Sequence, residues 1–113
     1  MGNAKSRIIE RLVMAFTIVF LPAAKKDIKN ASEWYEDKRF GLGKEFREAI
    51  VKTMDSLSDQ IKEYGPVYMG LSRIITKRFP FVIYFKKDAD RYRLVVCAVL
   101  HKKQSRDILK KRI

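Results

Sequence analysis

The apolar and polar positions of the chain change their spacing several times, and each change marks a predicted element. Apolar side chains occupy alternate positions over 15–21, which predicts a strand. Pro22 suits a first helical turn, and apolar residues then recur at steps of three and four, which predicts a helix over 22–39. Gly41 and Gly43 then interrupt this pattern, so we expect a break between two helices there.

A second apolar stripe at helical spacing follows the two glycines, and it ends at Gly65 and Pro66. Its members are Phe46, Ile50, Thr53, Leu57, Ile61 and Tyr64. Apolar periodicity of this kind ordinarily means that one side of the helix is buried. We therefore expect a core to which these residues contribute: Phe16, Ile18, Phe20, Ile28, Phe46, Ile50, Leu57, Ile83 and Val96.

After Gly70 the spacing becomes that of strands, which we expect over 71–77, 80–87 and 92–100. The last two are separated by turn-forming residues at 88–90, which predicts an antiparallel hairpin. A short basic helix over 105–112 closes the order β-α-α-β-β-β. The expected fold is α+β, with a helical hairpin packed on one face of a curved antiparallel sheet.

The positive charge of the chain is concentrated in its second half. The formal net charge is +12, from 25 Lys and Arg against 13 Asp and Glu. Residues 65–113 hold thirteen bases and three acids, whereas 15–64 hold nine of each. This asymmetry predicts one strongly positive surface and an anionic partner. Nucleic acid, an acidic protein and an anionic membrane all satisfy that description, and the alternative is a basic surface that serves solubility alone.

The chain has too few cysteine and histidine residues for a disulfide or a typical zinc site. Cys97 is the single cysteine, so no disulfide can form within the chain, and a reducing cytoplasm is compatible with the sequence. Cys97 and His101 do not follow the spacing of a zinc motif. We therefore expect no metal and no cofactor, and a fold held by packing.

The first residues are expected to form an extension, 1–14, ahead of a single domain over 15–113. The apolar run from Leu12 to Ala24 is too short to cross a bilayer as a helix. It would suit the core of a secretory signal, but its second half is needed for the predicted strand and helix. Met14 is an alternative start.

Four stretches of the sequence, taken in order, resemble one known family. They are F-L-P-A-A-K-K-D-I at 20–28, W-Y-E at 34–36, F-P-F-V-I-Y-F at 79–85, and V-L-H-K-K at 99–103 followed by Arg106 and Asp107. In this order and spacing they resemble the RelE/ParE superfamily, the toxins of type II toxin–antitoxin systems. The resemblance extends from Phe16 to about Asp107, with the element order derived above.

The resemblance implies a small basic toxin that a cognate antitoxin neutralises. One branch of the superfamily cleaves mRNA on the ribosome, whereas the ParE branch poisons DNA gyrase and has no established hydrolytic site. These are an enzyme and a protein-binding inhibitor, so the resemblance leaves open whether the chain is an enzyme.

Chemistry favours the ParE branch. Metal-free RNA cleavage needs groups that activate the 2′-hydroxyl, stabilise the phosphorane and protonate the leaving oxygen. The nuclease branch commonly places an arginine in the penultimate strand, where this chain has Val82. Valine supplies neither charge nor a proton. If the chain is nevertheless a nuclease, His101, Arg78 and Lys103 are its candidate catalytic residues, with Tyr84 near them.

The residues expected to bind a target or nucleic acid lie in the basic half: Arg73, Lys77, Arg78, Lys102, Lys103 and Arg106. His101 has two interpretations, an acid–base group or a strand-end histidine that fixes the following segment by a hydrogen bond.

Three further features are interpreted as structural. Trp34 and Tyr35 are expected in the core and in the helix–helix contact. Cys97 is expected to be buried on one strand face together with Val95 and Val99. The basic residues at 110–112 are expected to form a solvated tail, with binding of phosphate or of acidic antitoxin side chains as the alternative.

Overall fold

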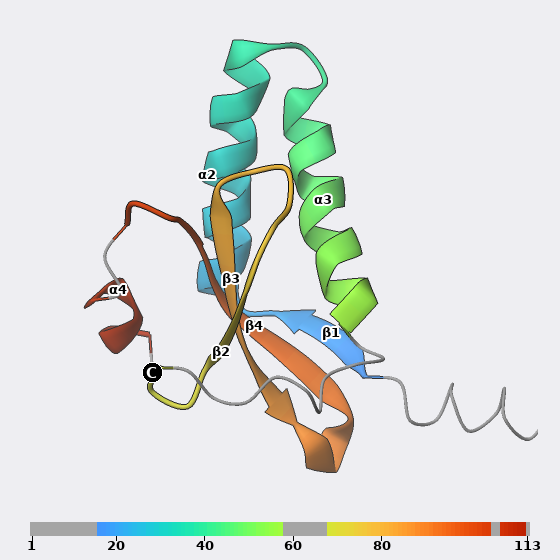
Figure 1. Ribbon diagram of the computed structural model, residues 1–113, viewed down its shortest axis with the longest axis vertical. Helices are drawn as coiled ribbons and strands as arrows, with labels where there is room; N and C mark the ends of the chain where they lie inside the picture. The colour runs from blue at the N-terminus through green and yellow to red at the C-terminus, as the bar shows by residue number, and fades with distance from the viewer. Residues whose placement is uncertain (1–15, 58–67, 105–106, 113) are drawn as a thin grey trace, which may run out of the picture.

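The computed structural model describes residues 16–57, 68–104 and 107–112 (Figure 1). Its elements in chain order are β1 (Thr17–Phe20), α2 (Pro22–Lys38), α3 (Leu42–Leu57), β2 (Ser72–Ile75), β3 (Phe81–Asp88), the 3-10 turn η2 (Ala89–Arg91), β4 (Arg93–His101) and α4 (Asp107–Lys110). The predicted α+β fold and the order β-α-α-β-β-β are confirmed. Any continuation of the second helix over Ile61 and Tyr64 lies outside the described residues.

The strands form one sheet in the order β1-β4-β3-β2. β3 pairs antiparallel with both β2 and β4, so the predicted hairpin is confirmed. β1, however, pairs with β4 in parallel, which corrects the expectation of a wholly antiparallel sheet. A long connection allows parallel pairing. Two helices and two strands separate β1 from β4, so no tight turn imposes the opposite direction.

α2 and α3 lie side by side against one face of the sheet and extend beyond its end (Figure 1). Their turn is tight: Gly41 has a φ of +86°, a left-handed conformation that favours glycine. At Gly43 a Cβ atom would lie 2.5 Å from the Ser32 carbonyl oxygen, so only glycine allows this close crossing. The Glu36 carboxylate accepts the N–H groups of both glycines at 2.9 Å, and these bonds lower its pKa.

The core between the helices and the sheet is rich in aromatic side chains. The ring of Tyr35 lies 5.3 Å from Phe46 and 4.9 Å from Phe79, measured between centroids. These contacts join α2, α3 and the loop before β3. Tyr35 is partly buried against this cluster, whereas Trp34 is 57% exposed. The expectation that both residues lie in the core is therefore wrong for Trp34 and holds in part for Tyr35.

All nine residues predicted for the core belong to this cluster. Five are buried, namely Phe46, Ile50, Leu57, Ile83 and Val96, and four are partly buried against them, namely Phe16, Ile18, Phe20 and Ile28. Within the described ranges, none of the helices is both long and apolar enough to span a membrane.

A β-bulge in β4 changes which face its side chains occupy. Tyr84 pairs with Ala98 but Phe85 pairs with Val96, so Cys97 is an extra residue between them. Before the bulge Val96 faces the helices, and after it Val99 does so. Cys97 is buried on the opposite face, which corrects the expectation that it shares a face with Val99.

That opposite face, called here the outer face, carries a second apolar cluster. Its strand members include Val82, Tyr84 and Leu100, and Leu109 of α4 is fully buried among them. Both faces of the small sheet are therefore covered, one by the helical hairpin and the other by the C-terminal helix and the residues around Leu71.

Neighbouring positions in α3 give a direct test of this core. Ile50 is fully buried and Val51 is 47% exposed. We expect Ile50→Ala to lower the free energy of unfolding by about 2–5 kcal/mol, because it leaves a cavity. Val51→Ala should change it by less than about 0.5 kcal/mol. Urea unfolding followed by circular dichroism measures both, and equal effects would show that the buried side of α3 is wrongly assigned.

Candidate functional site

Two segments meet where β4 ends and β3 begins. The Lys102 N–H donates a hydrogen bond to the Pro80 carbonyl oxygen at 2.9 Å, which places the loop 76–80 beside the turn 101–104. This end of the sheet, called here the basic end, carries Lys77, Arg78, His101, Lys102 and Lys103. Neither 68–87 nor 91–104 contains an Asp or Glu, so the surrounding segments add no negative charge.

Arg78 is held against the helices. Its guanidinium lies 2.6 Å from a Glu45 carboxylate oxygen, and Arg39 lies 3.0 Å from the other oxygen. The two arginines lower the pKa of Glu45, which keeps the carboxylate ionised. Arg78 also lies 5.1 Å from the ring centre of Phe79. Of the predicted catalytic residues, Arg78 therefore has a structural ion pair that fastens the loop to α3.

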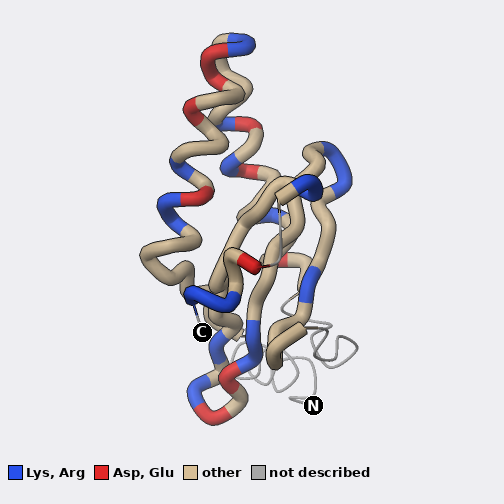
Figure 2. Tube along the Cα trace, turned by 90° about the vertical axis from the view of Figure 1, so that its left-hand side faces the viewer, with Lys and Arg blue, Asp and Glu red and all other residues tan. Residues whose placement is uncertain are grey.

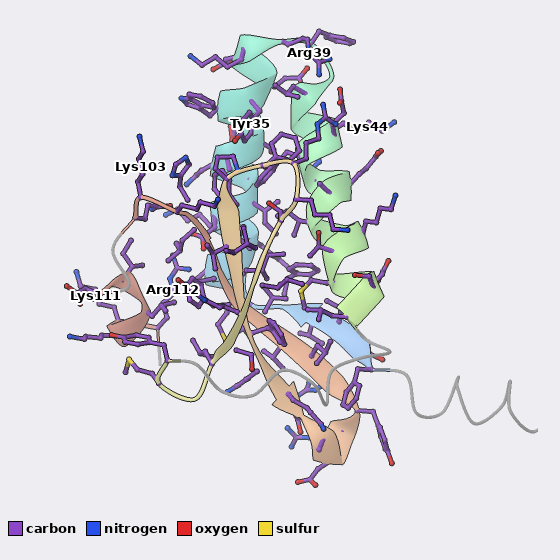
Figure 3. The ribbon with its side chains drawn as sticks, viewed as in Figure 1. Tyr35, Arg39, Lys44, Lys103, Lys111 and Arg112 are labelled. Atoms are coloured by element: carbon purple, nitrogen blue, oxygen red, sulfur yellow. The ribbon has the colours of Figure 1, made fainter. Side chains whose placement is uncertain are left out.

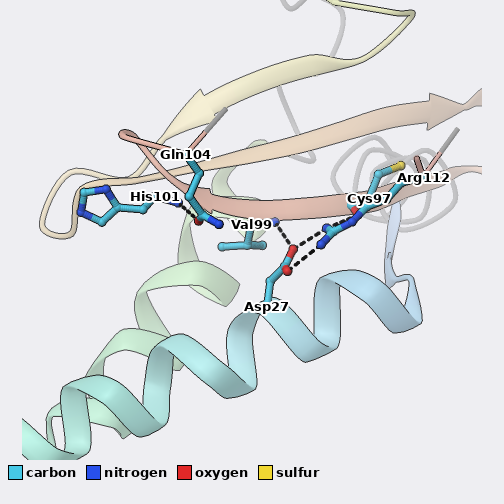
Figure 4. Close-up of polar contacts among 6 residues, drawn as sticks. All are labelled: Asp27, Cys97, Val99, His101, Gln104 and Arg112. Carbon is cyan, nitrogen blue, oxygen red and sulfur yellow. Dashed lines mark hydrogen bonds and ion pairs between the residues drawn. The ribbon is translucent and has the colours of Figure 1, made fainter. Parts of the chain in front are cut away.

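His101 fixes the turn that follows β4 (Figure 4). Its Nδ1 accepts the Lys103 N–H at 3.1 Å, and its own backbone N–H donates to the Gln104 side-chain oxygen at 2.7 Å. Its ring lies 5.3 Å from that of Phe81. This geometry is that of the strand-end histidine, and it leaves Nε2 free of these contacts.

Val82, at the position where the nuclease branch commonly has an arginine, is buried. Val82 is 5% exposed and belongs to the cluster of the outer face, between Ile75 and Leu100 of the neighbouring strands. Tyr84 is also 5% exposed in the same cluster. A phosphate at the basic end would therefore meet neither of these side chains.

The other predicted binding residues are spread over the basic half. Lys77, Lys102 and Lys103 are exposed at the basic end, and the Lys103 side chain points away from the molecule (Figure 3). Arg73 lies on β2 opposite Tyr84, so it belongs to the outer face. Arg106 lies outside the described residues.

A groove of about 540 Å³ runs between α3 and β2. Its apolar lining consists of Ala49, Ile74 and Ile75, and Ile75 is 44% exposed. The charged and polar residues of the lining are Lys52, Lys77, Arg78, Glu45, Glu48, Thr53 and Ser56. The groove lies along β2, which within the described residues has a neighbouring strand on one side only.

Cys97 and the acidic side chains show no sign of metal chemistry in the described part of the chain. There, no three of the His, Cys, Asp and Glu side chains lie close enough together to hold a metal ion. Burial raises the pKa of the Cys97 thiol, which disfavours the thiolate.

The sequence interpretation missed an ion pair that holds the C-terminal segment. Arg112 binds Asp27 of α2 with both guanidinium nitrogens, Nη2 at 2.8 Å from Oδ1 and Nη1 at 2.5 Å from Oδ2 (Figure 4). The same Oδ2 accepts the Val99 N–H at 3.0 Å, and Nη1 also donates to the Cys97 carbonyl oxygen at 3.3 Å. Arg112 is thus no part of a solvated tail.

One signal in the sequence points to this pair. Asp27 lies three residues after Ala24 and four before Ala31, so it lies on the apolar side of α2. A carboxylate in that position requires hydrogen-bond donors or a cation from another element. The sequence does not show which of the many C-terminal cations meets it.

We expect loss of the Asp27–Arg112 pair to destabilise the fold. The side chains are only 14% and 20% exposed, and Arg112→Gln leaves a carboxylate without its cation. The free energy of unfolding should fall by about 2–3 kcal/mol, whereas Lys111→Gln, at an exposed neighbouring position, should change it by less than about 0.5 kcal/mol.

A double-mutant cycle isolates the pair itself. Asp27→Asn combined with Arg112→Gln should show a coupling free energy of about 1–3 kcal/mol in urea unfolding. Strict additivity of the two substitutions would contradict a direct interaction between them.

Comparisons with known proteins agree with the fold. A family model described as "ParE toxin of type II toxin-antitoxin system, parDE" matches residues 18–106. Among solved structures, the chromosomal ParDE toxin–antitoxin system of P. aeruginosa is similar with a TM-score of 0.62 and 13% identity, over 78% of this chain and 97% of that one. No individually curated protein matches the chain.

A second solved structure with a similar fold is a toxin–antitoxin complex of the RelBE type. The RelBE2 toxin–antitoxin complex of Mycobacterium tuberculosis is similar with a TM-score of 0.54 and 15% identity, over 77% of this chain and 98% of that one. At these identities the two structures establish the fold alone. The family model covers most of the sequence, and by that match the chain belongs to the ParE toxin family of type II toxin–antitoxin systems.

Proposed function

We propose that this toxin inhibits growth by poisoning DNA gyrase and that a cognate antitoxin neutralises it. The observation that carries the choice of target is the burial of Val82. A hydrolytic site needs charged or proton-transferring groups around the phosphate, and an apolar cluster fills this part of the outer face. The alternative, a ribosome-dependent mRNA endoribonuclease of the RelE type, would have to use His101, Arg78 and Lys103.

The geometry of those three residues supports inhibition by contact. Arg78 is paired with Glu45, and the Nδ1 of His101 is occupied by the turn. Lys77, Lys102 and Lys103 remain exposed as a cluster of cations. Such a surface attracts an acidic or nucleic-acid-bound target and raises the association rate.

The antitoxin is proposed to bind in the groove between α3 and β2. Ile75 offers exposed apolar surface there. Glu45 and Glu48 of the lining are paired with Arg78 and Lys44, so Lys52 and Lys77 remain to attract an acidic segment. A partner chain can also add to the outer edge of β2 by backbone hydrogen bonds. Apolar contacts in the groove would supply specificity, and the charges would supply steering.

Antitoxin binding should depend on Ile75 and on salt. Ile75→Asp places a charge in the apolar part of the groove, and we expect the affinity for the cognate antitoxin to fall at least about tenfold, or 1.4 kcal/mol. Val51→Asp, an equally exposed β-branched residue outside this groove, is the matched control. Titration calorimetry at low and high salt measures both effects. An affinity that is the same for both variants, or flat with salt, would contradict the groove assignment.

Induction of the toxin should stop DNA synthesis before protein synthesis. Pulse labelling of both in growing bacteria, with a supercoiling assay of purified gyrase, measures this. Because the basic end makes contacts, Lys77→Ala, Lys102→Ala and Lys103→Ala should each weaken inhibition in a graded way, by about 1–3 kcal/mol. Lys26→Ala, an exposed cation on α2, is the control for loss of charge.

If the chain is a nuclease with His101 in its active site, His101→Ala should have a much larger effect than the lysine substitutions. Loss of a general acid or base costs about a hundredfold or more in rate. If induction cleaves mRNA at codon boundaries and His101→Ala alone abolishes the effect, the gyrase proposal is wrong and the nuclease takes its place.

A further inference from the structure

Three cations from three successive segments of the sheet lie on the outer face. Residues paired across neighbouring strands share a face. Arg73 pairs with Tyr84, and Lys86 pairs with Val95, and both partners belong to the cluster of the outer face. Lys86 also acts electrostatically on the Cys97 thiol of that cluster, which agrees with its placement.

Lys102 extends the same row at the basic end. Its N–H continues the ladder to β3 by donating to Pro80, so the alternation of β4 places its side chain on the same face as Leu100. Lys86 and Lys102 are exposed and Arg73 is partly exposed. The Lys111 side chain, beside α4, also points away from the molecule (Figure 3).

Three described carboxylates around this face are engaged by other cations, and one of them, Asp107 of α4, lies 3.4 Å from Lys110. Asp88 is bound by Arg93 at 2.8 Å and by Arg91 at 3.7 Å, and Asp27 is bound by Arg112. Within the described ranges, neither Arg73 nor Lys86 nor Lys102 has a carboxylate at ion-pair distance. In Figure 2 red and blue alternate along the helices, whereas the loop between β2 and β3 is blue. Among the described residues, the charges of Arg73, Lys86 and Lys102 are therefore not neutralised by an ion pair.

The outer face has little to offer an apolar partner at its centre. Tyr84 and Leu100 are 5% and 3% exposed, because α4 and the residues around Leu71 cover them. A protein partner needs a buried apolar centre for affinity. A partner that is recognised by charge alone needs no apolar centre, provided that it carries a regular array of anions.

We propose that the outer face binds the phosphate backbone of duplex DNA. The duplex carries one negative charge per about 1.7 Å of its axis, so spread cations meet phosphates without a shaped pocket. The choice of duplex DNA as occupant rests on the proposed gyrase target, because gyrase holds DNA at its surface. The toxin would then contact both the enzyme, through Lys77 and Lys103, and the DNA beside it, with Lys102 at the boundary.

The test measures DNA binding without gyrase. The purified full chain is titrated against a fluorescently labelled 30-base-pair duplex of mixed sequence, by anisotropy, over a range of salt concentrations. The triple variant Arg73→Gln, Lys86→Gln, Lys102→Gln should lower the slope of log K against log salt by about 3, since each phosphate contact contributes about 0.9. The control triple, Lys25→Gln, Lys26→Gln, Lys29→Gln, removes the same charge from α2 and should change the slope by less than about 1.

Each outcome decides the proposal. Equal losses in the two triples would mean that net charge alone drives binding, and the outer face would then be no DNA site. Competition by polyglutamate as strong as that by DNA at equal charge would assign the face to an acidic protein. Both variants are exposed-surface changes, and a circular dichroism melt confirms that they fold. Growth inhibition by the unaltered chain is scored separately, so failure of the gyrase proposal is distinguishable from failure of this one.

Discussion

The carboxylate of Asp27 is the interaction on which the arrangement of the sheet and the C-terminal segment depends. β1 ends at Phe20, but β4 continues to His101, so among the described residues the last part of β4 has no neighbouring strand on that edge. Backbone groups on such an edge need other partners. Asp27 accepts the N–H of Val99, and the Arg112 guanidinium bound to Asp27 donates to the Cys97 carbonyl oxygen on the same edge. Side chains thus continue the hydrogen bonding where strand pairing stops.

This arrangement also determines where the protein can offer binding surface. Because Arg112 is fastened to α2, α4 stays on the outer face and its Leu109 closes the second apolar cluster. Because the apolar side chains on both faces of the small sheet are covered, exposed apolar surface for a partner remains, among the described strands, only at the ends and edges of the sheet, and the outer face offers charge alone. The groove beside β2 and the basic end lie in those two places. The burial that stabilises the fold therefore accounts for the peripheral position of the candidate sites.

The periodic parts of the fold could be predicted from the sequence, because apolar spacing reports which side of a helix or strand is buried. The helices, the strand order along the chain and the hairpin were predictable for that reason. The bulge at Cys97 was not, because an extra residue within an unbroken apolar strand leaves no trace in the pattern. The parallel pairing of β1 and the partner of Arg112 depend on contacts between distant segments. Trp34 lies on the exposed side of α2, although the neighbouring Tyr35 packs partly buried against the core. For the candidate site, the sequence indicated the basic residues. It did not show which of them form ion pairs within the chain, as Arg78 does with Glu45.

Several carboxylates of the chain are engaged by its own backbone and arginines, which leaves the remaining lysines and arginines to act on the surroundings. Glu36 holds the turn between the helices, Glu45 holds two arginines, and Asp88 holds the hairpin end. Their pKa values are lowered by these bonds, so the carboxylates stay ionised and engaged well below neutral pH. Each of these acids has its partners nearby, whereas within the described ranges Arg73, Lys86 and Lys102 of the outer face have no carboxylate at ion-pair distance. Their field extends about a Debye length, 8–10 Å, into solvent, which is far enough to orient an approaching polyanion but carries little specificity. In the proposed function these features have separate tasks: charge on the loops and the outer face brings a partner close, and the apolar groove beside β2 discriminates among partners at contact.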